Sequence, residues 1–214
     1  MSKITKIKGR QVFDSRGNPT VETEIHLDDG SRASAIVPSG ASTGTYEAFE
    51  LKDTENKQYL GKSVIKAINK INGEISKKLI GISANEQKKI DKTLIELDGT
   101  KQKKRLGANT TLSVSLAANK ATAISENVPL YRNLSTGITL PLPLMNVING
   151  GAHANNFLRI QEFMIRPDKA KTFKEAINIC FLVIQKLKLL INKRNLSTSL
   201  GDEGGFAPSL SNNE

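Results

Sequence analysis

Alternating apolar and polar residues dominate the first part of the chain and predict β-strands between residues 4 and 37. A period of two places every second side chain on the same side of a strand, so that one face is buried and the other meets water. The clearest alternation predicts four inward positions: Val21, Thr23, Ile25 and Leu27. Asp29 and Gly30 then supply the residues of a tight turn. We therefore expect an antiparallel sheet, followed by a loop of small residues at 38–44.

A helical period replaces the alternation after residue 62. The first helix is expected from residue 62 to a stop at Gly81, because one apolar stripe runs along it: Val64, Ile68, Ile71, Ile75 and Leu79. Two further helices are expected at about 85–97 and 108–125. A sheet followed by helices is typical of an α+β domain. We place this domain at residues 1–135.

The pattern changes at about residue 140 and predicts a second domain over residues 136–214. Residues 160–165 form another strand pattern, and Thr172 with Glu175 fits a helix-capping box. The helix that follows carries one apolar stripe: Phe173, Ile177, Cys180, Ile184, Leu187 and Ile191. Strands that alternate with helices are typical of an α/β unit, so we expect the opening of a parallel sheet.

The formal net charge of +10 is the one unusual bulk property of the chain. A basic balance suits nucleic acid or an anionic substrate, but the densest cluster, residues 101–105, contains no aromatic residue for base stacking. This disfavours nucleic acid as a partner.

No apolar run is long enough for a membrane span and no signal peptide opens the chain, so the sequence predicts a cytoplasmic protein. Cys180, the one cysteine, is expected as a buried thiol.

Four places carry side chains suited to chemistry: the 39–44 loop, His153, the pair Gln161 and Glu162, and Glu203 between glycines. Glycines let the backbone beside Glu203 approach a ligand closely, although a solvated turn is the commoner meaning of such a pattern. His153 suits proton transfer or an anionic ligand, and equally a hydrogen-bonded structural role. Glu162 alternates with Ile160 and Met164, so we expect its carboxylate to be buried, where it needs a partner or a metal ion.

Five segments, in order, resemble motifs of the enolase family. They are the opening signature DSRGNPTVE (14–22), the active-site loop PSGASTG (38–44), the histidine segment NGGAHA (149–154), the second barrel strand QEFMI (161–165) and the acid-bearing strand end GDEGGFAP (201–208). The resemblance covers essentially the whole chain. It implies an α+β amino-terminal domain joined to the start of an incomplete enolase-type α/β barrel.

The resemblance also implies a reaction, the removal of water from 2-phosphoglycerate to give phosphoenolpyruvate, with Mg²⁺, a lysine base and a glutamate acid. Metal ions hold the charge of the intermediate, and an acid is needed because hydroxide is a poor leaving group. By motif match the acid is Glu203, supported by Glu162. His153 and Gln161 would contact the substrate, and Ser42 would reach the second Mg²⁺.

Phe157 and Arg159 depart from the family pattern, which in bacterial relatives commonly has polar or acidic residues there. A complete barrel takes about 250 residues, more than the 79 residues from 136 to 214, so we expect an open barrel that is inactive alone.

The first interpretation is an enolase whose remaining half is a separate chain or is missing, and the expected association is a homodimer or a complex with a carboxy-terminal enolase half. The second is a non-catalytic module that binds a partner, and the third is a nucleic-acid-binding module.

Overall fold

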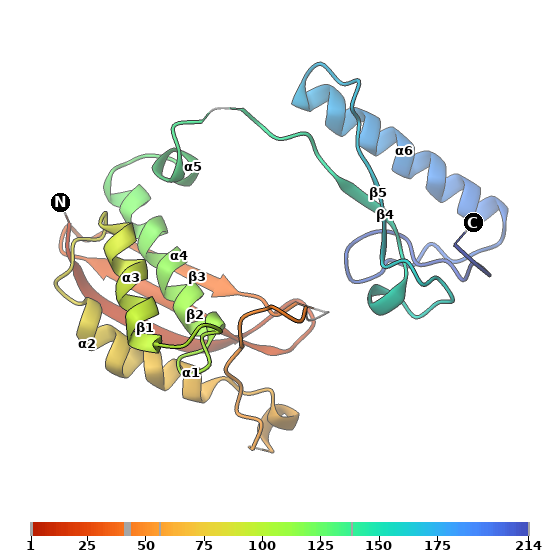
Figure 1. Cartoon of the computed structure of the whole chain (residues 1–214). Helices are drawn as coiled ribbons and strands as arrows, with labels where there is room; N and C mark the ends of the chain where they lie inside the picture. Colours follow the sequence, from red (N-terminus) through yellow and green to blue (C-terminus); the bar gives the residue numbers. More distant parts are fainter. Residues whose placement is uncertain (1, 41–43, 56, 138, 214) are drawn as a thin grey trace. The chain divides into compact units, whose positions relative to one another are not determined.

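The structure is a computed structural model that describes residues 2–40, 44–55, 57–137 and 139–213. The chain forms two compact units, Met1–Gly137 and Ile138–Glu214 (Figure 1). The family-domain boundary that the sequence places between residues 135 and 136 stays a prediction.

The first unit is an antiparallel sheet in the strand order β1–β2–β3, with helices packed on it (Figure 1). Its elements in chain order are β1 (Ile4–Phe13), β2 (Pro19–Leu27), β3 (Arg32–Val37), the 3-10 turn η1 (Gln58–Gly61), α1 (Ile65–Lys70), the π-helical turn η2 (Ile71–Ile75), α2 (Ser76–Leu79), α3 (Gln87–Asp98), α4 (Ala108–Ser125) and α5 (Leu130–Leu134). The helical run α1–η2–α2 packs on β1, and α4 packs on β2 and β3. The expected α+β arrangement is confirmed.

The alternation along β2 separates a buried face from a charged one. All four predicted inward positions are buried: Val21, Thr23, Ile25 and Leu27. On the opposite face, Arg10 Nε lies 3.2 Å from Glu22 Oε2, and Arg10 Nη2 lies 2.5 Å from Glu24 Oε2. Glu24 Oε1 also lies 2.6 Å from His26 Nε2. Hydrogen bonds from His26 and then from Arg10 lower the pKa of Glu24 to about 2.

The helix predicted over residues 62–79 begins at Ile65 and contains the π-helical turn η2. Asn72, on this turn, makes two hydrogen bonds with the backbone of Gly9 in β1. Its Oδ1 accepts from the Gly9 N–H at 2.7 Å, and its Nδ2 donates to the Gly9 carbonyl at 3.1 Å. This pair of hydrogen bonds ties the middle of the helical run to the sheet.

The second unit begins with two strands that pair antiparallel. Its elements are β4 (Met145–Asn149), the 3-10 turn η3 (Gly151–His153), β5 (Glu162–Ile165) and α6 (Phe173–Lys193). The expected parallel pairing is wrong for β4 and β5, because the connection at 150–161 contains only η3 and not the crossover that parallel strands need. A parallel bridge does join Ile148 to Phe206.

The predicted start of α6 at the N-cap Thr172 is confirmed, although the Glu175 carboxylate bonds the preceding residue. Thr172 Oγ1 accepts from the N–H of Glu175 at 3.1 Å, and Glu175 Oε2 accepts from the N–H of Lys171 at 2.8 Å. Cys180 is fully buried, as expected, and carries a free thiol.

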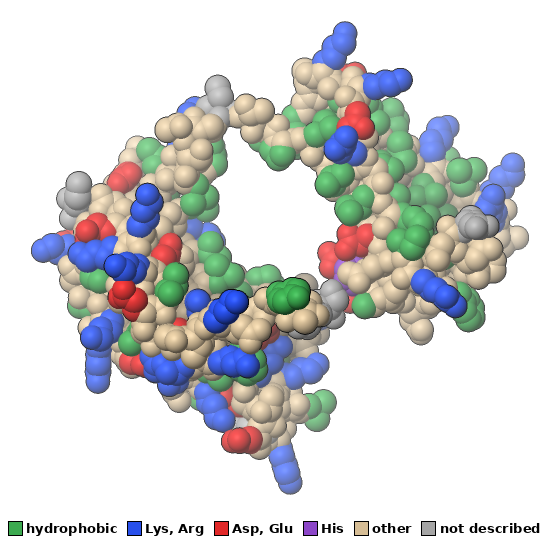
Figure 2. Space-filling model, in the orientation of Figure 1, with side chains coloured by type: hydrophobic (Ala, Val, Ile, Leu, Met, Phe, Trp, Pro, Cys, Tyr) green, Lys and Arg blue, Asp and Glu red, His purple; other side chains and the backbone are tan. Residues whose placement is uncertain are grey.

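Much of the apolar surface of α6 is exposed. Four large side chains along it are 51–62% exposed: Phe181, Leu182, Leu189 and Leu190. Figure 2 shows hydrophobic side chains gathered over this unit. Within the described parts of the chain, no helix is both long and apolar enough to cross a membrane.

Candidate active site

His153 lies between two carboxylates in the second unit. The residue ends η3 and is 6% exposed. Its Nδ1 is 3.5 Å from Glu162 Oε1, and its Nε2 is 3.8 Å from Glu203 Oε1. The same Nε2 is 2.8 Å from the side-chain nitrogen of Gln161. The structure thus brings together four of the five residues that the sequence singled out.

Two glycines let the chain fold back so that His153 meets Gln161. A Cβ on Gly150 would lie 2.4 Å from the carbonyl oxygen of Ile160, and Gly151 has a φ of +53°. The N–H of Gly150 donates to the Gln161 carbonyl at 3.0 Å, and the N–H of His153 donates to the Gly150 carbonyl at 3.0 Å. The double glycine therefore permits a close turn that a larger residue would block.

Glu203 sits on a tight turn that is tied directly to the histidine. The N–H of Gly201 donates to the carbonyl of Gly205 at 2.9 Å and closes the turn. The N–H of Asp202 donates to the carbonyl of His153 at 3.2 Å. The backbone thus holds the acid-bearing turn against η3.

The contact with Gln161 selects one tautomer of a neutral His153 ring. The amide nitrogen of Gln161 can only donate, so a neutral His153 accepts through Nε2 and carries its proton on Nδ1. This Nδ1 is buried and has no hydrogen-bond partner within the described residues, although Glu162 is 3.5 Å away. A histidine between two carboxylates is suited to hold or relay a proton.

Both carboxylates are open to a ligand. The side chain of Glu203 is 48% exposed and that of Glu162 is 31% exposed. The expected burial of Glu162 is wrong, because Ile160 and Met164 are 46% and 52% exposed and form an open face. An accessible carboxylate can meet a substrate without the cost of a fully buried charge.

The two departures from the family pattern lie on the surface. Phe157 is 77% exposed and Arg159 is also exposed, whereas Leu158 between them is buried. The local chain therefore anchors itself through Leu158 and turns both unusual side chains toward solvent.

The described residues do not by themselves fit a magnesium site. Within them, no group of three or more His, Cys, Asp or Glu side chains is arranged to hold a metal ion. Ser42, which the sequence assigned to the second Mg²⁺, lies outside the described residues. Hard divalent cations need several oxygen ligands, so the described carboxylates alone do not complete such a set.

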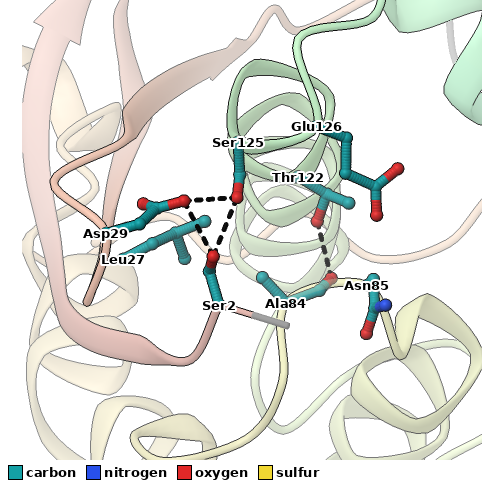
Figure 3. A pocket seen from close by; sticks show the side chains of 8 residues that line it. All are labelled: Ser2, Leu27, Asp29, Ala84, Asn85, Thr122, Ser125 and Glu126. Carbon is teal, nitrogen blue, oxygen red and sulfur yellow. Dashed lines mark hydrogen bonds between the residues drawn. The ribbon is translucent and has the colours of Figure 1, made fainter.

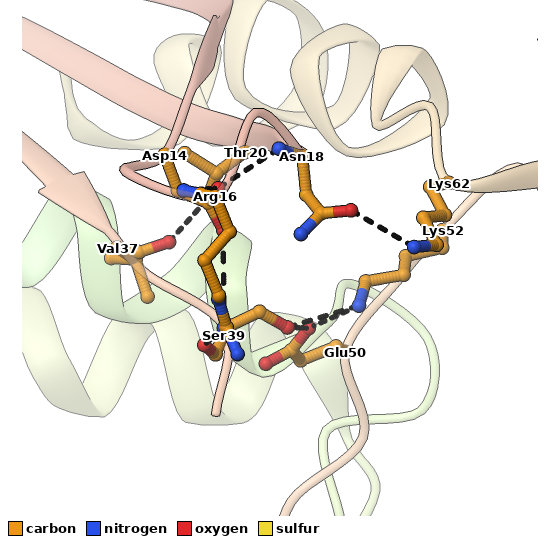
Figure 4. Close-up of polar contacts among 9 residues, drawn as sticks. All are labelled: Asp14, Arg16, Asn18, Thr20, Val37, Ser39, Glu50, Lys52 and Lys62. Atoms are coloured by element: carbon orange, nitrogen blue, oxygen red, sulfur yellow. Dashed lines mark hydrogen bonds and ion pairs between the residues drawn. The ribbon is translucent and has the colours of Figure 1, made fainter. Parts of the chain in front are cut away.

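The chain just before Ser42 is held by a polar network around Ser39 (Figure 4). Arg16 Nη2 donates to the Ser39 carbonyl at 2.5 Å, and Ser39 Oγ donates to Glu50 Oε2 at 2.5 Å. Lys52 Nζ donates to Ser39 Oγ at 3.0 Å and pairs with Glu50 at 2.9 Å. Arg16 of the opening signature therefore contacts the same residue, Ser39, as Glu50 and Lys52 of the segment that follows the loop.

A separate polar cavity of about 320 Å³ lies in the first unit (Figure 3). Asp29 accepts from the hydroxyls of Ser125 and Ser2, and these hydrogen bonds hold the pKa of Asp29 well below its usual range. Thr122 Oγ1 donates to the Ala84 carbonyl at 2.7 Å nearby. These bonds tie the start of the chain to the end of α4, which indicates a structural role.

Two asparagines beside the site received no role from the sequence. Asn149 ends β4 and is fully buried. Asn156 Nδ2 donates to the carbonyls of Asn149 at 3.0 Å and Pro208 at 3.1 Å. The available signal was the position of Asn149 directly before the double glycine.

Comparison with known proteins identifies the family of the chain. Residues 4–134 match the family model for the enolase N-terminal domain, and residues 137–214 match the model for the enolase C-terminal TIM barrel domain. The chain is 65% identical over 216 residues to the enolase of Pelagibacter ubique (strain HTCC1062), with 100% of this chain and 51% of that relative covered. It thus spans about half the length of that relative. These matches confirm the expected α+β domain followed by the start of a barrel, and the chain belongs to the enolase family.

Proposed function

We propose that the chain supplies part of the active site for the dehydration of 2-phosphoglycerate to phosphoenolpyruvate, a carbon–oxygen lyase step of glycolysis in the cytoplasm. The observation that carries this proposal is the placement of Glu162 and Glu203 on either side of the buried His153. Family membership adds the reaction type.

The leaving group of this reaction is hydroxide, which departs readily only when an acid protonates it. Glu203 is exposed enough to reach the substrate, and the turn at 201–205 holds it near His153. We assign Glu203 as the acid and Glu162 as its support. His153 and Gln161 would bind the anionic substrate, with the ring and the amide as hydrogen-bonding groups.

Magnesium is included in this proposal because the chain belongs to the enolase family. Ser42 is assigned to the second Mg²⁺ ion. The part of the enolase sequence that this chain does not span is expected to supply the other metal ligands, the lysine base and the residues that bind phosphate. We therefore propose that the 214 residues alone are inactive and that activity needs association with a carboxy-terminal enolase half.

The test is a coupled assay for phosphoenolpyruvate formation. The chain is assayed alone and together with a separately expressed carboxy-terminal enolase half, with and without Mg²⁺. We expect turnover only in the mixture with Mg²⁺, and a loss of about 10²–10⁴-fold in kcat for Glu203→Gln. Glu126→Gln, a change at an exposed acid in the first unit, serves as the matched control and should leave turnover unaltered. Turnover by the chain alone contradicts the need for a second half.

A second candidate function is a partner-binding module without catalysis. The exposed apolar side chains of α6 favour it, because contiguous apolar surface of this kind marks an interaction site or an aggregation-prone face. The partner would be another enolase chain, as a homodimer or as a complementary half. Co-purification with an enolase chain but no turnover in any mixture would favour this function. A folded, monodisperse monomer that retains no partner would contradict it.

A further inference from the structure

Asn149 is the most enclosed polar residue near the acid-bearing turn. It is 0% exposed, and its side chain is satisfied at both ends. Nδ2 donates to the Gly205 carbonyl at 2.7 Å, and Oδ1 accepts from Asn146 Nδ2 at 2.6 Å. A buried amide with both groups paired is specified by its surroundings.

The Gly205 carbonyl is the point where this amide acts on the turn. It accepts from Asn149 Nδ2 at 2.7 Å and from the N–H of Gly201 at 2.9 Å. Both of its acceptor positions are thus used, one by the bond that closes the turn and one by Asn149. The Asn149 side chain therefore reinforces the bond that gives the turn its shape.

Close packing binds the turn to the same side chain. A Cβ on Gly201 would lie 2.6 Å from Asn149 Nδ2 and 2.8 Å from its Cγ. The φ of Gly201 is not in the left-handed region, so the Asn149 amide, and not backbone strain, is what demands glycine there. Backbone bonds complete the attachment, since the N–H of Asn149 donates to the Phe206 carbonyl at 2.8 Å.

From these contacts we infer that Asn149 is a positioning residue for Glu203. The inference rests on the proposed function for its catalytic meaning. Asn149 does not touch the substrate in this scheme. It fixes the turn at 201–205 so that Asp202 stays bonded to the His153 carbonyl and Glu203 stays beside the ring.

The residue type follows from the geometry. The Gly205 carbonyl requires a donor and Asn146 requires an acceptor, and an asparagine of this length offers both. Aspartate keeps the acceptor, loses the donor and buries a charge. Alanine removes both groups and leaves the turn with only its backbone bonds.

Hydrogen exchange on the whole 214-residue chain tests the inference directly. In Asn149→Ala we expect the amides of Gly201 and Asp202 to exchange roughly ten-fold faster or more, which corresponds to the loss of about one hydrogen bond. Amides inside α6 should keep their protection. Asn155→Ala, a change at an exposed asparagine on the 150–161 connection, is the matched control and should leave the turn amides unaltered.

The ring resonances of His153 separate positioning from a general loss of stability. If Asn149 acts through Glu203, then Asn149→Ala changes these resonances in the same sense as Glu203→Gln, and the double variant adds no further change. Gly201→Ala disturbs the packing between the turn and the Asn149 side chain, so it should reproduce the effect of Asn149→Ala. Unchanged turn protection and unchanged His153 signals in both variants would overturn the inference. Loss of protection throughout the unit in both variants would assign Asn149 to stability alone and overturn it as well.

Turnover distinguishes this inference from the proposed function. In the assembled enzyme, Asn149→Ala should lower kcat about ten-fold or more with KM changed less than about two-fold, because His153 and Gln161 remain in place. If the unmodified mixture shows no turnover, the proposed function fails, while the exchange and resonance data still decide the positioning role. Full turnover by Asn149→Ala in an active mixture would overturn the positioning role alone.

Discussion

Asp53 holds the start of the helical run that packs on β1, and its removal gives the sharpest stability prediction. The side chain is 3% exposed. Its Oδ2 accepts from the N–H of Ile65 at 2.8 Å and its Oδ1 from the N–H of Lys66 at 3.0 Å. These are two of the first amides of α1, which have no partner inside the helix. Asp53→Ala leaves both without their acceptor.

The expected cost follows from two contributions. Loss of a capping acceptor costs about 1 kcal/mol, within a range of roughly 0.5–2, and a buried donor left unpaired costs about 1–3 kcal/mol. Both hydrogen bonds are only partly buried, so water replaces part of the lost acceptor. We expect a total of about 2 kcal/mol.

Glu55→Ala is the matched control, because Glu55 lies on the same loop and also contacts Lys66. Its Oε2 is 3.3 Å from Lys66 Nζ, and its side chain is 88% exposed. An exposed pair of this kind contributes about 0–1 kcal/mol. The comparison thus separates the capping bonds of Asp53 from the general effect of removing an acid beside α1.

Urea unfolding followed by tyrosine fluorescence measures both variants. The three tyrosines, Tyr46, Tyr59 and Tyr131, all lie in the first unit, and the chain has no tryptophan. The signal therefore reports the unit that contains Asp53. With a denaturant slope of about 1.5–2 kcal/mol/M, the midpoint of Asp53→Ala should fall by about 1–1.3 M, and that of Glu55→Ala by less than about 0.7 M. Equal midpoints for the two variants would refute the capping argument.

Two further predictions concern the first unit. The pKa of Glu24 is lowered from 4.5 to about 2 by hydrogen bonds from His26 and Arg10, so its stabilisation is fully present above pH 4.5 and is lost as the pH falls toward about 2. Urea midpoints between pH 6 and pH 2.5 should therefore fall less steeply in Glu24→Gln than in the unmodified chain, and parallel curves would count against this linkage. Gly107 has a φ of +91°, and a Cβ there would lie 2.5 Å from Asn109 Oδ1, so Gly107→Ala should cost about 3 kcal/mol from strain and overpacking. Gly30→Ala, at a φ of +86° with nothing within 4 Å, should cost only about 1 kcal/mol, and equal losses for the two glycines would remove the role assigned to packing.

The sequence predicted the regular part of the fold because periodicity reports burial directly. The four inward residues of β2 and the capping box of α6 were found in this way, since each depends on neighbours in the chain. The π-helical turn was not predicted. It accompanies the contact between Asn72 and Gly9, which are far apart in sequence, and a local pattern does not encode such a contact.

The second unit shows where the local patterns fail. The parallel pairing was inferred from the general architecture of α/β units, whereas the short connection between β4 and β5 dictates an antiparallel pair. The stripe expected on α6 is only partly buried, because Phe173 and Ile177 are each 41% exposed. Periodicity marks the face that a helix can bury, but burial also requires a partner on that face.

Sequence motifs identified the residues of the candidate site, but they did not predict its geometry. His153, Gln161, Glu162 and Glu203 are close together in the structure, while their roles stay predictions and Ser42 lies outside the described residues. No pattern in the sequence says that Asp202 donates to the His153 carbonyl, because that bond joins two turns that are distant in the chain. The same holds for Asn149, whose importance is visible only through its contact with Gly205.

The bonds that arrange the four site residues all lie within the second unit. His153 is tied to Gln161 through the glycine turn, and Glu203 is tied to His153 through Asp202. The arrangement therefore rests on hydrogen bonds that form inside this unit. If the proposed association with a carboxy-terminal enolase half covers the exposed face of α6, it should stabilise the unit that carries the carboxylates. Binding should then protect amides of the whole unit, whereas changes at Asn149 should affect the turn at 201–205 alone. The two effects have different residue patterns in one exchange experiment, so assembly and catalytic geometry can be measured independently in this chain.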